Sequence, residues 1–101
     1  MTDSLEVLPA EENLFGGILP KAHSLDADPE RFTIRLQHSL DTWRAAGYRL
    51  VWLEVPIERA ALIPIAVAAG FGFHHSDSKY LMMTLQLETA AFVPAYSSHY
   101  I

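Results

Sequence analysis

Two adjacent histidines, His74 and His75, are the residues of this chain best suited by type to bind a metal ion or exchange a proton. They lie in a stretch that we expect to form a strand, and adjacent residues of a strand point to opposite faces of a sheet. The pair is therefore not expected to chelate one ion, and a third ligand from His23, His38 or His99 lies far away in the sequence. We favour structural roles, with one ring at a buried interface and one in solvent, and keep a pH-sensitive contact as the alternative.

Three further motifs allow a chemical interpretation, and for each we favour a structural one. Glu54 is of the type used as a general base, but no activated partner is visible near it, so a solvated or capping carboxylate is expected. Ser98-His99 joins a nucleophile to a base without an acid to orient it. Trp43 and Trp52 could stack on a nucleobase, yet a helical stripe and an apolar strand favour core packing. We therefore assign no catalytic, cofactor-binding or metal-ligating residue.

The composition is that of one globular domain, because half of the 101 residues are hydrophobic and 19% are charged. Cysteine is absent, which excludes disulfides and thiolate sites and fits a cytoplasmic protein. The formal charge of −5 and the scattered basic residues argue against a nucleic-acid partner. Residues 1–13 lack the basic start of a signal peptide, and the uncharged stretch 60–73 is shorter than the roughly 20 residues that span a membrane.

The apolar pattern predicts two helices. The first begins at Asp28-Pro29, an N-cap followed by a proline at the first helical position, and ends at Gly47. The second covers Glu58–Ala69, and Pro64 either kinks it or moves its start to a later residue. No side chain from residue 60 to 69 is polar, so this helix is expected to be buried on more than one side and to dock on something outside the domain.

Four strands complete the predicted fold, an α/β domain with a small mixed sheet. They are expected at Phe15–Pro20, Arg49–Val55, Phe71–His75 and Tyr80–Leu87, the second covered on both faces and the last two forming a hairpin. A right-handed crossover makes the first two strands parallel. Residues 1–13 are predicted to be a flexible N-terminal segment, 14–88 the domain, and 89–101 a linker.

The order of elements resembles the C-terminal half of the GNAT acyltransferase fold. Leu53-Glu54-Val55 near the end of a strand and Gly70-Phe71 after a helix carry this resemblance. It implies the sheet order first, second, fourth, third strand. The loop that holds the pyrophosphate of acetyl-coenzyme A in that family is missing, since residues 22–29 contain two aspartates and no glycine, so acyl transfer is not expected.

A closer resemblance is to the pre-Nudix domain, the N-terminal region of a subgroup of Nudix hydrolases. It runs through most of the chain, but no stretch fits the Nudix box G-x5-E-x7-R-E-U-x-E-E-x-G-U, whose glutamates bind magnesium. The stretches that match the pre-Nudix domain are Phe15-Gly16-Gly17-Ile18, Trp43-Arg44-x-x-Gly47, Val51-Trp52-Leu53-x-Val55-Pro56-Ile57, Ala69-Gly70-Phe71-x-Phe73-His74-His75 and Pro94-x-Tyr96-x-Ser98-His99.

This resemblance implies that the chain is a non-catalytic accessory domain and not itself an enzyme. The parent would hydrolyse nucleoside diphosphates linked to another group, such as ADP-ribose or NADH, with magnesium in a catalytic domain absent from this chain. The accessory domain is expected to pack on that catalytic domain, support a homodimer or cover the substrate cleft. The alternative is a module that binds a nucleotide or a coenzyme A-like ligand in the cleft between the two parallel strands. The interface is expected to include Leu62, Ile63, Val67, His74 and His75.

Overall fold

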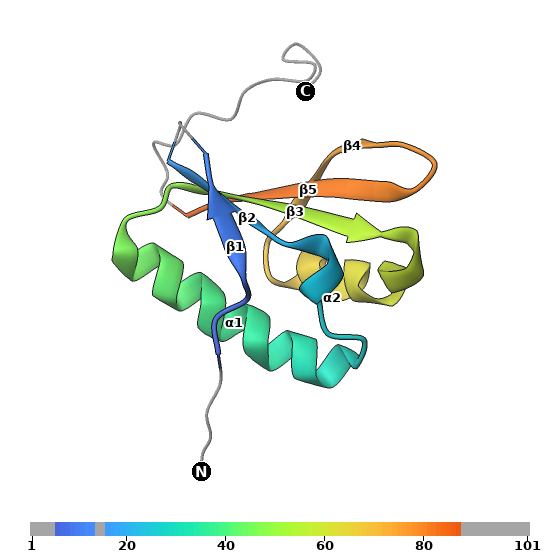
Figure 1. The fold of residues 1–101 in the computed structure, drawn as a ribbon, viewed down its shortest axis with the longest axis horizontal. Coiled ribbons are helices and arrows are strands. Elements are labelled where there is room, and N and C mark those ends of the chain that lie inside the picture. Colours follow the sequence, from blue (N-terminus) through green and yellow to red (C-terminus); the bar gives the residue numbers. More distant parts are fainter. Residues whose placement is uncertain (1–5, 14–15, 88–101) are drawn as a thin grey trace.

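The computed structural model describes residues 6–13 and 16–87 and shows one mixed sheet with both α-helices on the same side (Figure 1). This architecture confirms the predicted α/β class. The described sheet has five strands rather than four, because β1 lies within the segment predicted to be a flexible lead-in. The strands are β1 (Ala10–Glu12), β2 (Gly17–Pro20), β3 (Leu50–Pro56), β4 (Gly72–Ser76) and β5 (Tyr80–Gln86). The helices are α1 (Pro29–Ala46) and α2 (Ile63–Ala68), with the 3₁₀ turns η1 (Ala22–Ser24) and η2 (Ile57–Leu62).

The strand order is β1-β2-β3-β5-β4. β2 and β3 are parallel, whereas β5 is antiparallel to both of its neighbours and β1 is antiparallel to β2. With β1 set aside, this is the predicted order of first, second, fourth and third strand. The parallel pairing of β2 with β3 is short, because it joins only Gly17 to Leu50 and Ile18 to Val51.

Helix α1 forms where its caps and apolar stripe predict it. The Asp28 carboxylate accepts a hydrogen bond from the Glu30 amide at 3.2 Å, and Pro29 opens the first turn. Gly47 ends the helix with a φ of 95°, a left-handed conformation that side chains rarely adopt. The buried stripe of the helix consists of Phe32, Leu36, Leu40 and Trp43, together with Ser39.

The second predicted helix is divided into η2 and α2. Arg59 has non-helical backbone angles inside η2, and the α-helix proper begins only at Ile63. Pro64 therefore lies in the first turn of α2, where its missing amide would have no helical partner in any case. Of the two outcomes that the sequence allows, a later start is the one observed.

The two faces of β3 differ in burial. Val51, Leu53 and Val55 are at most 1% exposed and pack under the helices, whereas Trp52 and Glu54 are half-buried on the opposite side. We call this opposite side of the sheet the outer face. The prediction that both faces of this strand are covered is therefore met only in part on the outer face, because both α-helices pack against the same side.

The N-terminal part of the described chain belongs to the fold. Leu8 is 1% exposed and packs in the core, and β1 pairs with β2 from Ala10 to Glu12. The structure thus extends to the N-terminal side of residue 14, where the predicted domain begins. The predicted linker at 89–101 lies outside the described residues.

Candidate functional site

The two adjacent histidines lie on the same face of the sheet. In the pairing of β4 with β5, Phe73 is opposite Met83 and His75 is opposite Met82, so His74 is an extra residue in a β-bulge. The Nδ1 atoms of His74 and His75 are 2.8 Å apart. The prediction that the two rings point to opposite faces is therefore wrong, because the bulge breaks the alternation of side chains on which it rests.

These histidines are part of a row of rings along the outer face, which we call the aromatic row: Trp52, His74, His75 and Tyr80. The ring centroids of Trp52 and His74 are 4.9 Å apart, those of His74 and His75 are 5.1 Å apart, and those of His75 and Tyr80 are 6.0 Å apart. All three contacts are edge-to-face, which aromatic rings favour. Each member of the row is half-buried, so the row presents ring surface from three strands, β3, β4 and β5.

Trp52 is fixed at the start of this row by close packing on β2. A Cβ atom added to Gly17 would lie 3.1 Å from the indole nitrogen of Trp52 and 2.9 Å from the side-chain amide of Asn13. Core packing is confirmed for Trp43, which is 3% exposed, but Trp52 lies outside the core. No sequence motif identified Tyr80 as a candidate site residue. The one signal in the sequence is its position next to the predicted turn between the last two strands.

The hydrogen bond between the two imidazoles constrains their protonation. One Nδ1 donates and the other accepts, so at least one of the two rings is uncharged while the contact exists. Glu54 lies on the same face of the sheet, paired across the strands with Met82, and Met82 is paired with His75. The outer face therefore combines imidazole, thioether and carboxylate groups in one cross-strand row.

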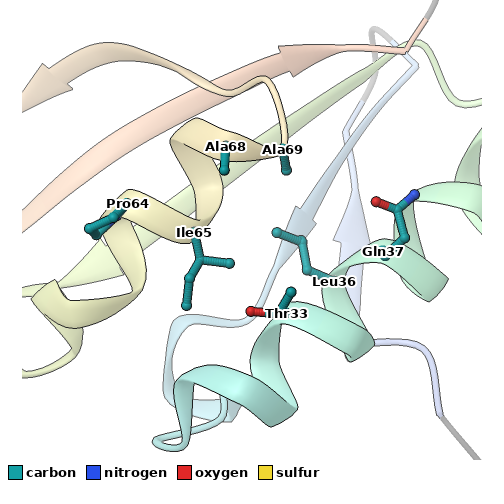
Figure 2. A pocket seen from close by; sticks show the side chains of 7 residues that line it. All are labelled: Thr33, Leu36, Gln37, Pro64, Ile65, Ala68 and Ala69. Atoms are coloured by element: carbon teal, nitrogen blue, oxygen red, sulfur yellow. The ribbon is translucent and has the colours of Figure 1, made fainter.

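Apart from the aromatic row, a groove of about 360 Å³ lies between α1 and α2 (Figure 2). Leu36 and Ile65 reach into it from the two helices. Its polar side chains bond locally, because the Thr33 hydroxyl donates to the Pro29 carbonyl and the Gln37 amide donates to Asp41. This groove therefore provides apolar contact and offers little for chemistry. It is lined by Thr33, Leu36, Gln37, Pro64, Ile65, Ala68 and Ala69.

The five residues of the predicted interface do not form one surface. Leu62 is 1% exposed and belongs to the core, while Ile63 is half-buried and Val67 is 47% exposed. His74 and His75 lie on the outer face of the sheet, on the side opposite to α2. The structure thus separates the helix residues from the histidines, and the interface itself stays a prediction.

The acidic side chains near the start of α1 have structural partners. Asp26 forms an ion pair of 3.0 Å with Arg35, and Asp28 caps the helix. Among the residues that the structure describes, no group of three or more histidines, aspartates or glutamates is placed to hold a metal ion. The described residues thus do not provide the carboxylate cluster that Nudix chemistry needs. Ser98 and His99 lie outside the described ranges.

Comparison with known proteins decides the family. The family model of the Nudix hydrolase domain matches residues 8–87 of this chain. The chain belongs to the Nudix hydrolase domain family. It is 35% identical to Nudix hydrolase 8 of Arabidopsis thaliana over 94% of this chain and 26% of that protein. It is 37% identical to the human nucleoside diphosphate-linked moiety X motif 6 over 93% of this chain and 31% of that protein.

A further plant relative, Nudix hydrolase 2 of Arabidopsis thaliana, is 33% identical over 96% of this chain and 35% of its own length. The Nudix chain thus spans between about a quarter and about a third of these curated relatives. The two plant relatives are both named as Nudix hydrolases.

Two predictions are corrected by this match. The prediction of a non-catalytic accessory domain is wrong, because residues 8–87 match the Nudix hydrolase domain itself. The prediction that this chain is not an enzyme, in contrast to its full-length parent, is wrong for the same reason, since the relatives are named as Nudix hydrolases. The comparisons do not distinguish a pre-Nudix subtype.

In the described part of this Nudix chain, no helix is both long and apolar enough to cross a bilayer. The cytoplasmic location, the homodimer and the absence of a nucleic-acid partner stay predictions.

Proposed function

We propose that this chain is part of an enzyme that hydrolyses nucleoside diphosphates linked to another group, such as ADP-ribose or NADH. The observation that carries the proposal is the match of residues 8–87 to the Nudix hydrolase domain family. The name of the human relative, nucleoside diphosphate-linked moiety X motif 6, supports this class of substrate. Because the chain spans only part of its relatives, the activity is proposed for the whole protein.

Magnesium is the cofactor that the Nudix resemblance implies. The described residues do not fit it, since no cluster of three or more acidic or histidine side chains lies among them. We therefore assign no step of the reaction to a metal held by residues 6–13 or 16–87. The proposed magnesium ligands come from residues outside these ranges.

The exposed side of α2 supports a homodimer as the assembled form. Val67 is 47% exposed on a segment without any charged side chain from residue 60 to 69, and Ala61, Pro64 and Ala68 are exposed with it. Covering apolar surface of this kind with a second copy of the chain is energetically favourable, because it removes that surface from water. The proposed dimer contact consists of Ile63 and Val67 on this side of the helix.

Two finer assignments concern subtype. The stretches that resemble the pre-Nudix region support a place in that subgroup, without the non-catalytic role that the family match contradicts. The strand order β2-β3-β5-β4 and the parallel pair β2–β3 support a relationship to the C-terminal half of the GNAT fold. Acyl transfer is not part of this proposal, because the loop before α1 is stabilised by Asp26 and Asp28 and has no glycine.

The test is hydrolysis by the full-length gene product. ADP-ribose and NADH are incubated with the protein and Mg²⁺, and release of nucleoside monophosphate is measured by chromatography. We expect monophosphate release that stops when EDTA removes the metal. AMP, which lacks a diphosphate bond, is the matched control and should remain unchanged. Absence of monophosphate release from both substrates would refute the proposed activity.

A further inference from the structure

The bulge in β4 places two imidazole nitrogens at the spacing of two ligands in one coordination sphere. The Nδ1 atoms of His74 and His75 are 2.8 Å apart. A metal ion lies roughly 2.0–2.1 Å from a ligating imidazole nitrogen. Two such nitrogens are therefore about 2.9 Å apart when they subtend a right angle at the ion, and about 3.4 Å apart at the tetrahedral angle. The observed separation matches the right-angle pair.

We propose that His74 and His75 form a bidentate site for a first-row transition-metal ion of square-planar or tetragonal preference, with Cu(II) as the ion that fits it best. Neutral imidazole is a suitable ligand for copper, and Cu(II) binds such nitrogen sites more tightly than the other divalent ions of its row. On binding, the ring that donates in the present hydrogen bond moves its proton from Nδ1 to Nε2. Once the two rings turn from the N–N line toward the ion, both Nδ1 lone pairs bind it, and water completes the coordination.

The surroundings of the pair restrict its motion. Trp52 contacts the His74 ring at a centroid distance of 4.9 Å, and Tyr80 contacts the His75 ring at 6.0 Å. Both histidines are half-buried, so less rotamer freedom is lost on binding than for exposed side chains. The site uses two protein ligands, because the described residues contain no larger cluster of metal-binding side chains.

The first measurement is titration of the full chain with Cu(II), followed by electron paramagnetic resonance. We expect a tetragonal spectrum with hyperfine coupling to two equatorial nitrogens. We also expect quenching of Trp52 fluorescence, because its ring contacts His74. Little quenching is expected in W52F, because Trp43 lies on the buried side of α1, across the sheet from the histidines. A wild-type spectrum with one coordinated nitrogen or none overturns the proposal.

Single substitutions distinguish Cu(II) binding by the His74–His75 pair from binding at other side chains of the protein. In His74→Gln and in His75→Gln, loss of one of two ligands is expected to weaken Cu(II) binding by about tenfold or more, with one imidazole nitrogen left in the spectrum. His23→Gln is the matched control, since His23 lies in η1 and not on the three strands of the aromatic row. Its Cu(II) affinity should equal that of the wild type. Circular dichroism checks that each variant is folded. Equal affinity in His75→Gln and the wild type, or an equal loss in His23→Gln, would show that this pair is not the site.

Discussion

The hydroxyl of Ser39 accepts a hydrogen bond from the backbone amide of Leu8 at 2.9 Å, inside the core. Ser39 lies on the buried stripe of α1 and is fully buried. Leu8 lies just before β1, which begins at Ala10. This contact fixes the N-terminal segment against the long helix across 31 positions of sequence.

Replacing Ser39 with alanine is expected to lower the free energy of unfolding by about 1–3 kcal/mol, because the Leu8 amide is left buried without its acceptor. Urea denaturation followed by circular dichroism measures the change. Thr42→Ala is the matched control on the exposed side of the same helix, where the threonine hydroxyl bonds only to the His38 carbonyl. Its effect should stay within about 0.5 kcal/mol. Similar losses in the two variants would contradict the role given to Ser39.

Gly17→Ala tests the packing of Trp52 on β2. The added methyl group would lie 2.9 Å from the Asn13 side chain and 3.1 Å from the Trp52 indole nitrogen, so these groups must move. We expect a loss of about 1–3 kcal/mol in unfolding free energy and a shift in tryptophan emission. Gly72→Ala is the control, because a Cβ atom at Gly72 meets nothing within 4 Å. A wild-type emission spectrum in Gly17→Ala would refute the close contact.

The contact between Tyr48 and Glu12 predicts a pH effect. The hydrogen bond from the Tyr48 hydroxyl to the Glu12 carboxylate raises the pKa of Tyr48 above its ordinary value, and nearby negative charge acts in the same direction. A raised pKa in the folded state means that this stabilisation is complete below pH ~10 and is lost as the pH rises through the folded value.

We expect Glu12→Gln to lower the pKa of Tyr48, which spectrophotometric titration of tyrosinate measures as an earlier rise in absorbance. Glu11→Gln is the neighbouring control, since Glu11 pairs with Lys21 at 3.4 Å and does not contact Tyr48. Identical titration curves for Glu12→Gln and the wild type would contradict the assignment.

Val67→Asp tests the proposed homodimer. An exposed valine tolerates a charge without damage to the core, whereas a charge buried between two copies opposes association. We therefore expect a smaller mass by size exclusion with light scattering and an unchanged melting temperature. Ile34→Asp, at a 57% exposed position of α1, is the control. If the mass of Val67→Asp equals that of the wild type, this side of α2 is not the interface.

The sequence by itself determined the elements whose signals are local. Asp28, Pro29 and Gly47 specify the ends of α1 through caps that involve only neighbouring backbone groups. The apolar stripe of this helix predicted its buried side, because helical periodicity needs no knowledge of the rest of the fold. The strand order was also predicted, although from a family resemblance rather than from periodicity.

Only the tertiary structure decided the aromatic row and the place of the N-terminal segment. A bulge depends on how β4 pairs with β5, so His74 and His75 could not be placed on one face from strand alternation alone. β1 is three residues long, and its pairing with β2 together with the hydrogen bond from Leu8 to Ser39 identifies it as part of the fold. Both features arise from contacts between distant parts of the chain, which local pattern does not encode.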